Sequence, residues 1–191
     1  MSWAHHILLH MFGRPRGLPG RLGGVIMARV NRDAAAAVIA LLEVRAGDKL
    51  LEIGFGPGVG IQLLSDIVSA GYVAGIDSSP EMVSQATARN AAAIRSGRVD
   101  LRRGSADALP FADGTFDKAF AVNAMQVWPD AASGLREIRR VLKSGGMTAL
   151  GFTPHSGQSR HGITDALTAA GFTDARIVER AKVFSVIASK P

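Results

Sequence analysis

From residue 49 onward, short apolar runs alternate with segments of helical periodicity, which limits the folds open to this chain. The apolar runs are typical of strands buried on both faces of a sheet. The expected strands are residues 49–54, 72–77, 98–104, 116–123 and 147–153, with two more inside 175–189. The expected helices are residues 33–44, 59–68, 78–94, 130–146 and a segment near 159–170. This order predicts an α/β three-layer sandwich with a mostly parallel seven-stranded sheet, and the tight join inside 175–189 predicts a C-terminal antiparallel hairpin.

Composition excludes several classes of protein. The 191 residues are 47% hydrophobic, which is enough to build the core of one domain. The absence of cysteine excludes disulfides, thiolate metal sites and a cysteine nucleophile, and no metal site is expected. Residues 5–12, HHILLHMF, are too short and too rich in histidine for a secretion signal. No apolar run reaches the roughly 18 residues of a membrane span. We therefore expect a cytoplasmic protein.

Positive charge is concentrated at the start of the chain. Residues 1–32 contain five arginines and no acidic residue, although the whole chain has a net charge of only +6. The glycines and prolines of residues 13–24 argue against regular structure there. We expect two units, a basic N-terminal arm or lid at 1–32 and a catalytic domain at 33–191. The arm could also attract nucleic acid or a membrane surface, which we favour less, or be a solvated charge run.

The segment LLEIGFGPGVG, residues 50–60, joins the first strand of the alternating region to a helix through a loop with four glycines. In sheets of this kind, ligands bind beyond the carboxyl ends of the strands, and such a loop lets a ligand approach the backbone. A dinucleotide fingerprint requires a third glycine at the sixth position. That position is Val59 when counted from Gly54 and Ile61 when counted from Gly56, although Gly60 lies one residue away. The spacing disfavours a dinucleotide.

The same segment reads E-x-G-x-G-x-G from Glu52 to Gly58, which resembles the first motif of class I S-adenosylmethionine-dependent methyltransferases. Three further segments resemble the small, type 11 members of this family in the same order. They are GIDSSPEMV after the second strand, GSADALPFADGTFD after the third, and VNAMQVWPD followed by EIRRVLKSGGMTAL. The resemblance covers about residues 33–190. It implies a Rossmann-like fold and S-adenosylmethionine as cofactor, with S-adenosylhomocysteine as product.

The resemblance also implies which residues bind the cofactor. Glu52 lies near the methionine amino group in this family, and a carboxylate suits that cation. Asp77 can accept hydrogen bonds from both ribose hydroxyls, a role that dinucleotide enzymes share. Ser105 stands where the family often has an acid, so the side chain that meets the adenine amino group stays open between Ser105 and Asp107, while the Ala106 amide can still contact the adenine edge. The full predicted set is Glu52, Gly54, Phe55, Gly56, Gly58, Asp77, Ser78, Met82, Ser105, Ala106, Asp107 and Asn123.

The methyl acceptor is less constrained. A hydroxyl acceptor needs a base, whereas an amine or a thiolate can react without one. His155, after the fifth strand, is the candidate base, with a solvated loop histidine as the alternative. Gln126 and Trp128 are the candidate lining of the acceptor pocket. The chain leaves no room for a separate recognition domain, so we expect a small-molecule acceptor, anionic or lipid-like. The methylated atom and the oligomeric state are not predicted.

Two other functions stay open at this point. An NAD(P)-dependent oxidoreductase could use the same type of sheet. The glycine spacing and the lack of a Tyr-x-x-x-Lys pair argue against it, because the only tyrosine is Tyr72. A non-catalytic binding module could keep the fold and use the basic arm on an anionic partner. A methyltransferase that moves the methyl group by in-line displacement is the function that the four segments favour.

Overall fold

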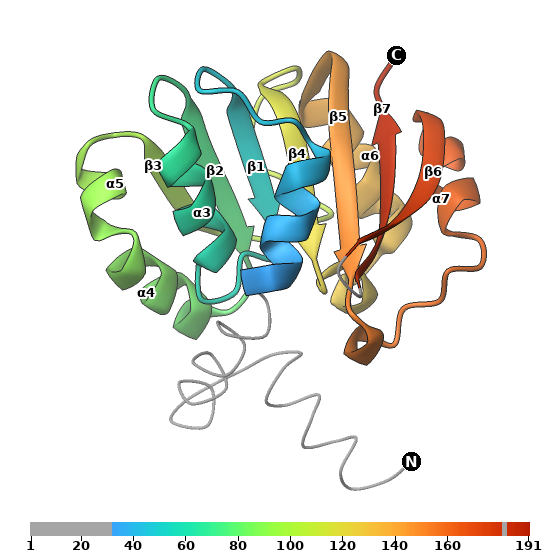
Figure 1. The fold of residues 1–191 in the computed structure, drawn as a ribbon, viewed down its shortest axis with the longest axis horizontal. Helices are drawn as coiled ribbons and strands as arrows, with labels where there is room; N and C mark the ends of the chain where they lie inside the picture. Colours follow the sequence, from blue (N-terminus) through green and yellow to red (C-terminus); the bar gives the residue numbers. More distant parts are fainter. Residues whose placement is uncertain (1–31, 181–182) are drawn as a thin grey trace, which may run out of the picture.

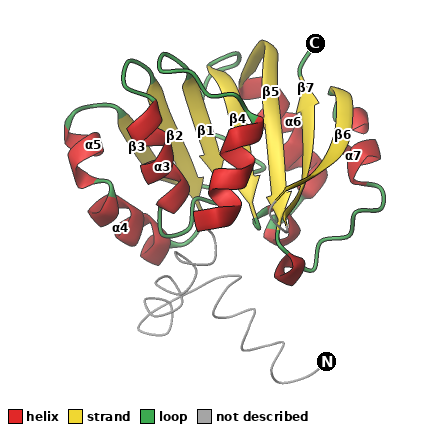
Figure 2. Ribbon diagram, in the orientation of Figure 1, coloured by secondary structure: helices red, strands yellow, loops and turns green. Residues whose placement is uncertain are grey.

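The computed structural model describes residues 32–180 and 183–191. In this described part, a seven-stranded sheet has the order β3-β2-β1-β4-β5-β7-β6. The strands are β1 (Lys49–Ile53), β2 (Tyr72–Asp77), β3 (Val99–Arg103), β4 (Phe116–Val122), β5 (Leu142–Phe152), β6 (Thr173–Arg180) and β7 (Val183–Ser189). β7 pairs antiparallel with both β5 and β6, and the other described pairs are parallel (Figure 2). The predicted sheet and C-terminal hairpin are confirmed.

Helices cover both faces of the sheet, which gives the three expected layers (Figure 1). One face carries the helix at 32–41, coloured blue and unlabelled in the figure, together with α3 (Val59–Ile67), α4 (Pro80–Arg89) and α5 (Ala91–Arg95). The other face carries α6 (Ala131–Val141) and α7 (Ile163–Ala169). Two short 3₁₀ helices, η2 (Met125–Val127) and η3 (Pro154–Ser156), follow β4 and β5.

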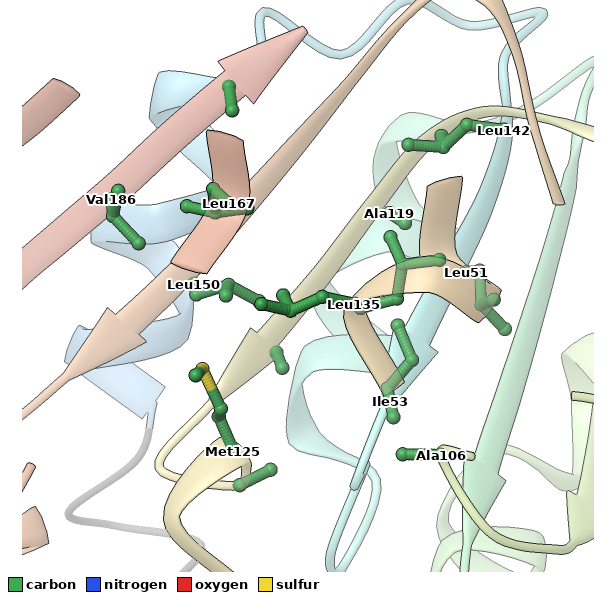
Figure 3. Close-up of a cluster of buried hydrophobic side chains, with 14 of the residues drawn as sticks. Leu51, Ile53, Ala106, Ala119, Met125, Leu135, Leu142, Leu150, Leu167 and Val186 are labelled. Carbon is green, nitrogen blue, oxygen red and sulfur yellow. The ribbon is translucent and has the colours of Figure 1, made fainter. Parts of the chain in front are cut away.

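A separate hydrophobic cluster lies on each face. Leu135 of α6 and Leu167 of α7 are fully buried against the strands on one side, in the cluster that Figure 3 draws. Val38 and Ile61 are fully buried on the other side. Each such side chain stabilises the fold by about 2 kcal/mol through burial. The helical spacing of apolar residues therefore corresponds to the faces that pack on the sheet.

One helix boundary was predicted wrongly. The sequence predicted a helix over 130–146, but α6 ends at Val141 and β5 begins at Leu142. Leu142 pairs with Phe116 of β4, and the amide of Gly145 donates to the carbonyl of Lys190 at 2.8 Å. Pairing with distant strands therefore replaces the local helical tendency in this segment.

Other boundaries also differ from the expectation. The predicted helix 78–94 is interrupted at Asn90, which separates α4 from α5. Of the predicted arm, only Arg32 belongs to the described residues, as the start of the first helix, and the rest lies outside them. No helix within the described residues is long and apolar enough to cross a membrane.

Candidate active site

The loop after β1 has a backbone conformation that residues with a side chain rarely adopt. Gly54, Gly56 and Gly58 have φ angles of +76°, +53° and +79°, in the left-handed region that glycine adopts without strain. The Gly54 amide donates to the carbonyl of Ile76 at 2.7 Å, which fixes the start of the loop against β2. The loop is therefore a tight, hydrogen-bonded turn between β1 and α3.

Glu52, one residue before the end of β1, is a buried carboxylate without a cationic neighbour in the part of the chain that the structure describes. Its side chain is 3% exposed, and Oε2 has no hydrogen-bond partner among the described residues. Burial raises the pKa of Glu52 well above its ordinary value, and the nearby Asp77 carboxylate raises it further. A hydrogen bond from the Ile61 amide opposes this shift. An orphaned carboxylate oxygen of this kind suits a cationic ligand group.

Asp77 lies at the end of β2 and is held by backbone amides. The amide of Gly56 donates to Oδ2 at 2.8 Å, and the amide of Ser79 donates to Oδ1 at 2.9 Å. Burial raises the pKa of Asp77, and these amides lower it. Because each carboxylate oxygen can accept more than one hydrogen bond, both stay able to bind a pair of ligand hydroxyls.

The connections after β2 and β3 form the next wall of the site. Ser79 caps α4 by accepting a hydrogen bond from the Met82 amide at 3.3 Å, which places the buried Met82 in the first turn. Nε of Arg103, the last residue of β3, donates to the Ser78 carbonyl at 3.3 Å. Ala106 is buried beyond it. This end of the site is a slot between two loops that could hold a flat ring.

The end of β4 supplies the remaining wall. Asn123 has a φ of +50°, and its Oδ1 accepts a hydrogen bond from the Thr153 amide at 2.8 Å, which ties the loop after β4 to the end of β5. The ring of Trp128 packs against α6 at Gly134, where a β-carbon would lie 2.7 Å from Cε3 of the ring. The glycine thus lets the indole lie close to the helix backbone.

These walls enclose a cavity of about 270 Å³. It brings together most of the predicted residues: Glu52, Gly54, Phe55, Gly56, Asp77, Ser78, Met82, Ser105, Ala106, Asn123 and Trp128 all line it. Four predicted residues do not line it. Gly58 packs against Ala86 and Asn90, and the Asp107 carboxylate accepts the Ser105 hydroxyl. Gln126 donates to the Asn123 carbonyl at 2.7 Å, and His155 is exposed in η3.

Several lining residues were not predicted. Arg103 and Gly104 follow the third strand at the same edge as Glu52 and Asp77, so the rule on carboxyl ends could have found them. Val127, which is 37% exposed, lies between predicted neighbours. Ala35, from the helix at 32–41, also lines the cavity. No local pattern indicated Ala35, because its position depends on how that helix packs on the sheet.

The donors and acceptors of the cavity fit S-adenosylmethionine. The unpaired oxygen of Glu52 can take a cationic amino group, Asp77 can take two ribose hydroxyls, and the slot beside Met82 can take an adenine. The left-handed Gly54 and Gly56 line the cavity and leave the backbone open to a ligand at this point. Among the described residues, no group of three or more His, Cys, Asp or Glu side chains could hold a metal ion.

The known proteins described next, which resemble this chain in sequence, are methyltransferases. The family model described as "Methyltransferase domain" matches residues 51–150. The uncharacterized methyltransferase YdaC of Bacillus subtilis is 32% identical over 80% of this chain and 87% of its own length. The 27-O-demethylrifamycin SV methyltransferase of Amycolatopsis mediterranei is 35% identical over 58% of this chain, but over only 40% of its own length.

Solved structures agree on the fold. An S-adenosylmethionine-dependent methyltransferase from Aquifex aeolicus has a TM-score of 0.75 at 22% identity, over 86% of this chain and 97% of that one. A chain from the complex between the Haloferax volcanii Trm112 methyltransferase activator and a methyltransferase has a TM-score of 0.79 at 22% identity. That match covers 88% of this chain and 92% of the other.

Proposed function

Because the chain belongs to the S-adenosylmethionine-dependent methyltransferase family, we propose that it transfers the methyl group to a small, mainly apolar acceptor by in-line displacement. The observation that supports this proposal is that charged side chains line only one part of the cavity. The charged side chains of its described lining are Glu52, Asp77 and Arg103, and all three lie at the ends of β1, β2 and β3. We call this part of the cavity the cofactor half. The part beside β4, which we call the acceptor half, has no charged side chain among the described residues.

The cofactor half would bind and orient the methyl donor. When bound, S-adenosylmethionine supplies an electrophilic methyl carbon on its sulfonium. Glu52 would hold the amino group, Asp77 the ribose hydroxyls and the Met82 side the adenine, with the glycine loop beneath the cofactor. The protein then contributes mainly by holding donor and acceptor in line, which can account for a large part of the rate enhancement.

The acceptor half supports an apolar substrate over an anionic one. Its lining includes Ala35, Val122, Val127, Trp128 and Pro129, with Asn123 as a polar group at the end of β4. An indole face favours stacking with a flat ring. An anionic acceptor would find no cation there among the described residues, whereas an aromatic or lipid-like one would bury apolar surface.

Proton removal is a separate question. The prediction that His155 acts as a base stays a prediction, and it requires His155, which is exposed in η3, to approach the acceptor. If it is the base, His155→Ala lowers kcat by about a hundredfold, with a loss of the acidic limb of the pH profile. A change of less than about twofold would mean that the acceptor reacts without this histidine.

The described chain begins close to the acceptor half of the cavity. Arg32 begins the helix whose Ala35 lines the cavity, so residues 1–31 join the described chain close to the cavity. We propose that the apolar segments of the arm, HILLHMF and LGGVIMARV, contact the acceptor and take part in closing the site. Removal of residues 1–31 should then raise the KM for the acceptor and leave the affinity for S-adenosylhomocysteine unchanged. Binding of RNA or anionic vesicles that depends on the arm would instead support the surface-contact alternative.

Calorimetry tests the cofactor, and a screen with labelled cofactor tests the acceptor. We expect S-adenosylmethionine and S-adenosylhomocysteine both to bind, and label to pass to aromatic or lipid-like small molecules. Failure of both ligands to bind would refute the assignment of this cavity as the cofactor site. Transfer only to charged acceptors would refute the proposed acceptor class.

A further inference from the structure

The outer side of the glycine loop is held by the C-terminal end of α4. Nδ2 of Asn90 donates to the carbonyl of Gly58 at 3.1 Å and to that of Ala86 at 2.9 Å. Nε of the preceding Arg89 donates to the carbonyl of Pro57 at 2.8 Å. Two successive carbonyls of the loop are therefore bound by two successive side chains from another βα unit.

A single face of α4 connects this contact to the cavity. Met82, Ala86 and Asn90 are four residues apart and thus lie on one side of the helix. Met82 lines the cavity. At Gly58, a β-carbon would lie 2.7 Å from both Cβ of Ala86 and Nδ2 of Asn90. The loop and the helix are therefore in close contact at Gly58, with no space between them for a side chain.

Asn90 is also an unfavourable residue for this position. It is 4% exposed, and its Oδ1 has no hydrogen-bond partner among the described residues. Leaving a buried acceptor unpaired destabilises a fold. The two carbonyls do not require Asn90, because the Gln62 amide donates to Gly58 at 3.1 Å and the Asn90 amide donates to Ala86 at 2.9 Å. An apolar side chain of similar shape would leave no carbonyl unpaired there.

We propose that Asn90 is a positioning residue for cofactor binding, which acts through the Gly58 carbonyl to hold the loop of Gly54, Gly56 and Gly58 in its binding conformation. This rests on the proposed use of that loop as the cofactor cradle. Asn90 destabilises the fold through its unpaired oxygen, but its amide nitrogen aligns the loop. Functional sites can keep a residue that breaks a rule of good packing in this way. Arg89 assists from the surface side through Pro57.

The test separates binding from stability. We expect Asn90→Leu to keep or raise the melting temperature, since it removes an unpaired buried oxygen, and to raise the Kd for S-adenosylhomocysteine at least about tenfold at 25 °C. Asn90→Ala should weaken binding by a similar factor with a lower melting temperature. The matched control is Thr148→Val in β5, which removes another buried oxygen without a partner among the described residues. Thr148 does not line the cavity, so the Kd should not change.

Two outcomes would overturn the inference. If Asn90→Leu and Asn90→Ala both bind S-adenosylhomocysteine within about twofold of the unmodified protein, the side chain does not position the loop. If affinity is lost only in proportion to a falling melting temperature in both variants, Asn90 is merely structural. Failure of the unmodified protein to bind the ligand would refute the cofactor cradle itself, which is a different result.

Discussion

The carboxylate of Glu52 lies against the backbone of Gly60, in the space where a β-carbon would otherwise be. Gly60 is the second residue of α3, a position where most residues are tolerated. Its lack of a side chain is therefore explained by the buried acid of β1. Gly60 lies one residue away from the third glycine of a dinucleotide fingerprint. The space that it leaves for Glu52 explains this glycine without a dinucleotide.

Gly60→Ala should displace the Glu52 carboxylate and weaken S-adenosylmethionine binding at least about tenfold. The fold should persist, because alanine is favoured over glycine inside a helix by about 1 kcal/mol. Calorimetry with the cofactor measures the effect. Gly47→Ala is the matched control, since a β-carbon there meets nothing within 4 Å. Unchanged affinity in Gly60→Ala would contradict the placement of Glu52.

The stability of the ligand-free protein should fall as the pH rises above the ordinary pKa of Glu52, about 4.5. Burial raises the pKa of Glu52 in the folded state, so the folded protein binds the proton more tightly than the unfolded chain does. The resulting stability is fully present below the ordinary pKa and is lost as the pH rises through the raised one. Asp77, whose pKa is also raised, contributes in the same direction.

Glu52→Gln should remove much of this slope, raise the melting temperature at neutral pH and weaken cofactor binding. Scanning calorimetry from about pH 4 to about pH 8 on both proteins measures the slope. Parallel curves for the two proteins would show that Glu52 is not the group responsible. A variant that binds the cofactor as the unmodified protein does would exclude the contact to the amino group.

Asp77→Ala should weaken cofactor binding more than tenfold, which corresponds to about 1.4 kcal/mol or more for lost charge-assisted hydrogen bonds. The amides of Gly56 and Ser79 would also lose their acceptor, so part of the effect comes from the loop. Asp66→Ala, at an exposed position of α3, is the control and should bind normally. The ribose role is untenable if a folded Asp77→Ala retains full affinity.

Gly134→Ala should shift the indole of Trp128, because the new β-carbon would lie 2.7 Å from Cε3 and 3.1 Å from Cζ3 of the ring. A misplacement of about 1 Å can lower a rate by up to a hundredfold, so we expect kcat/KM for the acceptor to fall at least about tenfold. The Kd for S-adenosylhomocysteine should change by less than about threefold.

Fluorescence can follow the ring directly. The chain has two tryptophans, so a Trp3→Phe background leaves Trp128 as the single emitter. In that background, the emission maximum should differ between the protein that keeps Gly134 and the Gly134→Ala variant. Arg136→Ala, exposed on the same helix, is the control. Identical spectra and kinetics for Gly134→Ala would argue against a Trp128 wall at the acceptor half.

Much of the fold could be predicted because its signals are local. The continuous apolar runs at 49–54 and 72–77 became β1 and β2, and the helix predicted to start at residue 78 begins as α4 at Pro80. The segment at 142–146 was predicted wrongly because its pairing partners, Phe116 and Lys190, are distant in sequence. Local helix propensity carries no information about a pairing partner that is distant in sequence.

The sequence by itself determined the order of strands and helices, the glycine-rich loop and the two acids that end neighbouring strands. Because parallel strands place their carboxyl ends at one edge of the sheet, the two acids lie together at that edge. Only the tertiary structure decided why Gly60 lacks a side chain, which carbonyl Asn90 holds, that Ala35 lines the cavity and that His155 does not. These depend on the packing of helices from separate βα units, and a contact between residues 58 and 90 leaves no periodic trace along the chain.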